Sequence, residues 1–89
     1  MTIYQKELRR QLTERHPDAS TAQVLDLLVE MGVVDVTRCK VLAVRCYVEQ
    51  LVQQGCRKVD AMYDAADHFC CSYEYVRKCM YYYKDVNLI

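Results

Sequence analysis

The sequence predicts an all-α fold, a small orthogonal bundle of about five helices. Apolar residues recur at intervals of three and four along most of the chain, which is the spacing of one helix face. The two glycines and the single proline stand where such segments end. Residues 33–36, VVDV, resemble a strand but have no partner of similar character, so they cannot build a sheet and are expected to form a connection.

A chain of 89 residues encloses one core, and its content of 53% hydrophobic and 27% charged residues is typical of globular proteins. We therefore expect a single domain over residues 1–89. Within it, residues 1–36 form an N-terminal helical brace and residues 37–84 form a trihelical unit.

Two helices are expected in the brace. The first covers residues 4–15, ends before Pro17, and repeats apolar side chains at every fourth position, namely Tyr4, Leu8 and Leu12. The second begins after Ser20, which forms a capping box with Gln23. Gly32 can take the left-handed conformation that ends this helix. The second helix has a broad apolar face made of Val24, Leu25, Leu27, Leu28 and Met31.

Three more helices are expected in the trihelical unit. Thr37 is expected to cap a long helix that reaches Gln54 and is closed by Gly55. Its apolar stripe, which should make it the most buried helix, consists of Val41, Val44, Val48 and Leu51. A short helix follows, with apolar positions at Val59, Met62, Ala66 and Phe69. Ser72 can cap the last helix, 73 to about 83, whose expected inward residues are Val76, Cys79 or Met80, and Tyr83.

The charges of the whole chain balance, with twelve basic and twelve acidic residues. Residues 1–36 carry a net charge of −2 and residues 37–84 a net charge of +3, so any electrostatic function is regional. No window approaches the roughly 20 apolar residues of a membrane span, and the beginning of the chain lacks a secretion signal. We expect a cytoplasmic protein with no membrane partner.

The sequence offers little support for catalysis or for a cofactor. Six cysteines are present, but they form no CxxC pair, and the adjacent Cys70 and Cys71 point in diverging directions, so no metal site is expected. The cysteines are better read as thiols that act as small apolar side chains. No phosphate-binding glycine loop occurs, and no third group orients a Cys and His pair. We expect neither enzymatic activity nor a small-molecule substrate.

The most informative segment is AADHFCCSYEYVRK, residues 65–78. Its order is a small residue, an apolar residue, a short turn, a serine, and a valine four residues after the serine, which suits a sharp crossing of two helices. Over residues 62–80 this order resembles the helix-turn-helix family of DNA-binding domains. The matching positions are Ala66, Phe69, Cys70, Cys71, Ser72 and Val76, with Cys79 at the next inward position. Glycine commonly occupies the turn position that Cys70 holds here.

The resemblance implies that the helix at residues 72–83 reads the major groove of double-stranded DNA. Arg77 suits guanine, Glu74 can accept from cytosine, and Lys78 and Lys84 can neutralise phosphates. The implied DNA-binding residues are Ser72, Tyr73, Glu74, Arg77, Lys78, Tyr81 and Lys84. The implied function is that of a transcriptional regulator or a DNA-organising factor, which can act as a homodimer.

A second interpretation follows from the tyrosines. Five of the eight lie within eleven residues, and three are consecutive, so they cannot all face one core; they are Tyr73, Tyr75, Tyr81, Tyr82 and Tyr83. Tyrosine gives large and rigid contact area at interfaces. The alternative is thus a protein-interaction or oligomerisation module that uses the Tyr-rich last helix or the leucine face of residues 24–31.

Overall fold

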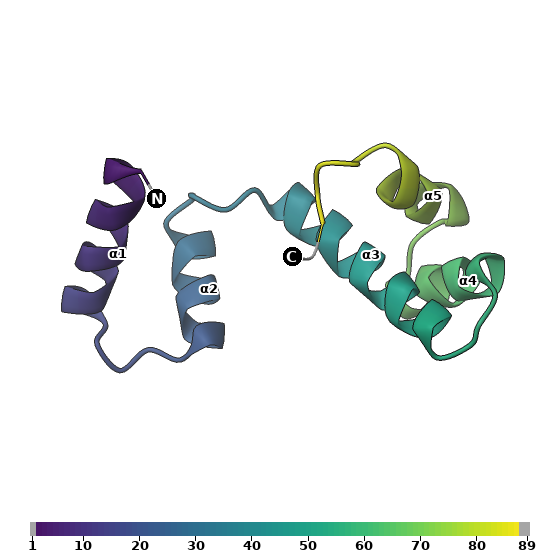
Figure 1. The fold of residues 1–89 in the computed structure, drawn as a ribbon, viewed down its shortest axis with the longest axis horizontal. Helices are drawn as coiled ribbons and strands as arrows, with labels where there is room; N and C mark the ends of the chain where they lie inside the picture. The colour runs from purple at the N-terminus through teal and green to yellow at the C-terminus, as the bar shows by residue number, and fades with distance from the viewer. Residues whose placement is uncertain (1, 88–89) are drawn as a thin grey trace. The chain divides into compact units, whose positions relative to one another are not determined.

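A computed structural model describes residues 2–87 and confirms the all-α class, with helices and no strand in this part of the chain (Figure 1). None of the described helices combines the length and the apolar character needed to span a lipid bilayer. The helices are α1 (Ile3–Arg15), α2 (Thr21–Glu30), α3 (Val36–Gln53), α4 (Lys58–His68) and α5 (Tyr73–Tyr81).

The helices fall into two compact units, one up to Val34 and one from Asp35 onward. The first unit contains α1 and α2, and both begin with a capping box. Ser20 and Gln23 form the expected one at α2, and Thr2 and Gln5 form a second one at α1 that the sequence reading missed. Neither α1 nor α2 has a buried residue in the described structure.

The second unit packs α3, α4 and α5 around one core, and α3 supplies Val41, Val44 and Val48 to it as expected. The facing residues from the rest of the unit are Ala61, Met62, Ala65, Ala66, Val76, Cys79, Met80 and Val86. Because most of these side chains are small, the three helices approach one another closely.

Two expected inward positions of α4 are wrong. Val59 and Phe69 are exposed, Phe69 by 38%, and Ala61 and Ala65 take the inward positions instead. The expected positions Met62 and Ala66 are buried, but the two alanines Ala61 and Ala65, rather than Val59 and Phe69, complete the buried face. Phe69 packs edge-on against Tyr47 of α3 and against its neighbour His68.

The start of α3 also corrects the sequence reading. Asp35, not Thr37, is the N-cap, and its carboxylate accepts from the backbone N–H of Arg38 at 3.2 Å. Aspartate is as good an N-cap as threonine, so the helix begins earlier and takes in Val36. At the other end of the unit, α5 ends at Tyr81 rather than near Tyr83.

In the described chain, α2, α3 and α4 end in the same way, in a Schellman motif with a left-handed residue after the C-cap. Gly32 and Gly55 take this position with φ of 76° and 102°, as expected. After α4 the position belongs to Cys70, with φ of 53°. Its N–H donates to the carbonyl of Asp67 at 3.3 Å, and the N–H of Cys71 donates to that of Ala66 at 3.0 Å.

We predict that Cys70→Gly stabilises the protein by about 1 kcal/mol, because glycine adopts the left-handed conformation without a Cβ clash. The midpoint of thermal unfolding should rise by about 4–8 °C. Cys70→Ala is the matched control, since it removes the thiol and keeps the Cβ. Equal melting temperatures for the glycine and alanine variants would contradict the prediction.

Candidate nucleic-acid interface

The elbow between α4 and α5, residues 69–72, is tight and hydrogen-bonded throughout. The Schellman motif closes α4, and two residues later the hydroxyl of Ser72 accepts from the backbone N–H of Tyr75 at 3.0 Å and caps α5. Ala65 and Val76 are fully buried on the two sides of the bend. The direction of α5 is therefore fixed by the turn and by the core together.

The inner face of α5 is made of Val76, Cys79 and Met80, all buried. Its outer residues line a small hollow of about 80 Å³, and they are Glu74, Arg77, Lys78, Tyr81 and Tyr82. Four of the residues implied by the resemblance thus lie on one surface. The fifth lining residue, Tyr82, was not among the implied set.

The other three implied residues lie apart from this hollow. Ser72 uses its hydroxyl in the cap of α5, although the residue is exposed. Tyr73 is half-buried, and its ring stacks on that of Tyr63 of α4 with centroids 4.3 Å apart. Lys84 is exposed in the segment after α5.

The positively charged side chains on the outer face of α5 are not paired with carboxylates among residues 2–87. Among residues 2–87, neither Arg77 nor Lys78 takes part in an ion pair. Lys58, at the start of α4, adds a third cation, since its Nζ lies 4.8 Å from the centroid of the Tyr81 ring. This cation–π contact carries the positive surface from α5 to the beginning of α4.

Two of the aspartates of α4 are engaged elsewhere. Asp60 pairs with Arg57, with 3.0 Å between Oδ2 and Nε, and Asp64 accepts from the hydroxyl of Tyr47 at 3.3 Å. The Asp64 carboxylate and burial both raise the pKa of Tyr47, burial having the larger effect. Asp67 is exposed close to the elbow, and its carboxylate stays available to oppose phosphates.

Arg45 of α3 holds the far end of α5, a role that sequence reasoning missed. Its Nη1 donates to the carbonyls of Cys79 and Met80 at 3.0 and 2.7 Å, and its Nη2 donates to Oδ1 of Asn87 at 3.0 Å. The last carbonyls of a helix lack partners within the helix and carry a partial negative charge, so a guanidinium there satisfies both needs. A charged residue next to Val44 in the apolar stripe of α3 was the available signal.

The segment after α5 packs on the core through Val86. Val86 is only 7% exposed and belongs to the core, whereas residues 88 and 89 lie outside the described part. The carboxylate of Asp85 pairs with Arg38 of α3, and this hydrogen bond lowers the pKa of Asp85. Lys84 is thereby kept close to the end of α5.

Two of the side chains considered for metal binding or catalysis, Cys79 and His68, pack against neighbouring residues. Cys79 is buried, and this burial raises the pKa of its thiol and favours the neutral form. The ring of His68 stacks on that of Tyr47 with centroids 4.4 Å apart. In the described part of the chain, no three His, Cys, Asp or Glu side chains are placed to hold one metal ion.

Comparison of the chain with protein-family models, with curated proteins and with solved structures gives no match.

We predict that Arg45→Met lowers the free energy of unfolding by about 1–3 kcal/mol, because methionine keeps the aliphatic packing and loses the hydrogen bonds of a charged donor. Urea unfolding followed by circular dichroism measures the loss. Hydrogen exchange at residues 79–82 should accelerate as the end of α5 loosens.

Arg57→Met is the control for Arg45→Met. The side chain of Arg57 is 86% exposed and, among residues 2–87, forms an ion pair with Asp60 alone, so its loss should change stability by less than about 0.5 kcal/mol. Equal stabilities for the two variants would show that Arg45 does not hold α5.

Proposed function

We propose that this chain is a non-enzymatic DNA-binding protein, a transcriptional regulator or a DNA-organising factor, in which α5 enters the major groove. The observation that carries the proposal is the outer face of α5, where Arg77 and Lys78 stand exposed beside Glu74 and Tyr81, without ion pairs among residues 2–87.

The dimensions and spacing of α5 support this proposal. Glu74, Arg77, Lys78 and Tyr81 follow one another at intervals of three, one and three residues, so they share a face about two turns long. A helix with its side chains is about 10–12 Å wide and the major groove is about 12 Å wide, so such a face can meet base edges directly.

The chemistry of each side chain suggests its role. The planar fork of Arg77 suits O6 and N7 of guanine, and Glu74 can accept from N4 of cytosine. Lys78, Lys84 and Lys58 can neutralise phosphates on the flanks of the groove. Since residues 37–84 have a net charge of only +3, affinity should be modest at physiological salt and should fall steeply as salt increases.

We predict that Arg77→Ala weakens binding to a selected duplex by about 1–3 kcal/mol and relaxes its sequence preference, because a bidentate base contact is lost. Lys84→Ala should weaken all duplexes alike and reduce the salt dependence, because only a phosphate contact is lost. Selection from a random-sequence duplex pool followed by fluorescence anisotropy titration measures both effects.

Lys40→Ala serves as the matched control, because Lys40 is an exposed lysine of α3 outside the proposed surface. Its affinity for DNA should stay within about twofold of the unchanged protein. The proposal fails if the unchanged protein binds no duplex at low salt, or if Lys40→Ala is as harmful as Arg77→Ala.

A second candidate function, a protein-interaction module, is favoured by one observation. Tyr82, the C-cap residue of α5, is 75% exposed although it is a large aromatic residue. Such a ring is typical of an interface anchor. If this surface mediates self-association, the Tyr81→Ala and Tyr82→Ala double variant should lose an oligomer that light scattering detects in the unchanged protein; a strict monomer at high concentration would exclude self-association there.

A further inference from the structure

We propose that α1 and α2 form the interface of a homodimer, in which α1 of each copy packs against α2 of the other. This inference concerns the first unit and does not depend on the DNA-binding proposal, because its surface and its test involve neither α5 nor DNA.

The first observation is an apolar surface without a core. Neither helix of the first unit has a buried residue, and Ile3 and Tyr4 are 76% and 83% exposed. Further exposed apolar side chains of the unit are Leu8, Leu25, Val29, Met31 and Val33. The unit is shorter than about 40 residues, and domains below that length usually need a further partner to fold stably. We therefore expect another surface to cover its exposed apolar side chains.

The second observation is that the two helices carry opposite charges. Four basic and two acidic residues give α1 a net charge of +2, and Asp26 and Glu30 give α2 a net charge of −2. Among residues 2–87, no ion pair joins α1 to α2. The opposite charges of the two helices therefore do not pair with each other within residues 2–87.

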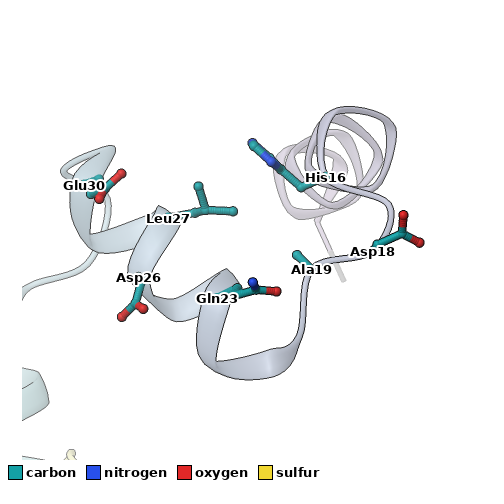
Figure 2. A pocket seen from close by; sticks show the side chains of 7 residues that line it. All are labelled: His16, Asp18, Ala19, Gln23, Asp26, Leu27 and Glu30. Carbon is teal, nitrogen blue, oxygen red and sulfur yellow. The ribbon is translucent and has the colours of Figure 1, made fainter.

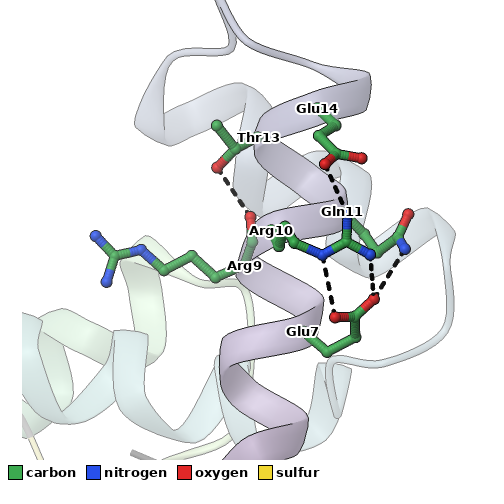
Figure 3. A network of polar contacts seen from close by, with 6 residues as sticks. All are labelled: Glu7, Arg9, Arg10, Gln11, Thr13 and Glu14. Carbon is green, nitrogen blue, oxygen red and sulfur yellow. Dashed lines mark hydrogen bonds and ion pairs between the residues drawn. The ribbon is translucent and has the colours of Figure 1, made fainter.

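The basic edge of α1, Lys6 and Arg9, borders a shallow hollow of about 680 Å³ on that helix. Figure 3 shows Arg9 extending away from the pairs that Arg10 makes with Glu7 and Glu14. The hydrogen bonds from Arg10 and, to a lesser degree, from Gln11 lower the pKa of Glu7 to about 2. Two carboxylates of α1 therefore compensate the charge of Arg10, whereas Arg9 takes part in no ion pair among residues 2–87. Arg9 precedes Leu12 by three residues, which places this charge beside the apolar stripe.

The acidic edge of α2, Asp26 and Glu30, borders a second hollow, of about 430 Å³ (Figure 2). Leu27 lies between them in sequence and lines the same hollow, and Asp18 of the preceding loop adds a third carboxylate. Thus each helix presents an apolar stripe with a charged edge, and the two edges are opposite in sign.

A second copy is the partner that these features fit best. In a two-fold dimer every contact occurs twice, so α1 on the partner's α2 is matched by α2 on the partner's α1. A surface that carries one basic and one acidic edge is complementary to itself in this arrangement. Both apolar stripes are covered by the same two contacts.

The experiment uses the full chain without DNA and measures molar mass by sedimentation equilibrium. One variant reverses the basic edge, Lys6→Glu with Arg9→Glu, and the other reverses the acidic edge, Asp26→Lys with Glu30→Lys. In a dimer of either variant, both contacts between α1 and the partner's α2 bring like charges together. The dissociation constant of the dimer should therefore rise about tenfold or more.

Mixing the two variants is the decisive step. In a mixed dimer both contacts again join opposite charges, so the mixture should recover the dimer although neither variant forms it alone. Glu49→Lys, an exposed charge reversal on α3, should leave the dimer unchanged. Circular dichroism checks that all variants keep their helix content.

Three results would overturn the proposal. The unchanged chain could be a monomer at high micromolar concentration. Its dimer could be insensitive to both edge reversals. A chain that carries all four substitutions could recover the dimer while the mixture of the two double variants does not. That result would show that the basic and acidic edges meet within one chain. None of these results bears on whether α5 binds DNA.

Discussion

The persistence of α5 as a helix depends on contacts outside it. Nine residues are too few to form a stable helix in water, because the cost of the first turn is recovered over too few hydrogen bonds. Ser72 satisfies one backbone N–H at the beginning of the helix, Arg45 binds the carbonyls at its end, and burial of Val76 and Cys79 holds its middle. Among residues 2–87, the side chains of Glu74, Arg77 and Lys78 on the outer face take part in none of these contacts.

Because the caps and the buried face stabilise α5, its outer face is free to contact another molecule. Arg77 and Lys78 can be exposed and without ion pairs within residues 2–87 because the stability of α5 comes from the other side of the helix. The segment after α5 is also held in place, because Val86 is buried in the core two residues after Lys84. The charges proposed to meet DNA therefore sit on a rigid support, which reduces the entropy lost on binding.

The features that the sequence predicted well are local ones. Capping by Ser20 and Ser72 and the left-handed closures at Gly32 and Gly55 each depend on a few neighbouring residues, so the pattern is visible in the sequence.

The features it missed join distant segments or depend on side-chain direction. Arg45 meets Asn87 across more than 40 residues, and no periodicity reports that contact. The sequence pattern predicts that Phe69 faces inward and Tyr73 outward. Instead, Phe69 packs against Tyr47 of α3 and Tyr73 stacks on Tyr63 of α4. The outer residues of α5 were predictable because an amphipathic helix has only one face left once the other is buried.

The valines of α3 have a mechanical consequence. A β-branched side chain in a helix has essentially one rotamer, so Val41, Val44 and Val48 form a ridge of fixed shape. Ala61 and Ala65 opposite them have no rotamers to change, which leaves Met62 and Met80 as the adjustable side chains of this core. A change of side-chain volume in α3 can therefore be absorbed by Met62 and Met80, and what these two cannot absorb must shift the helices themselves.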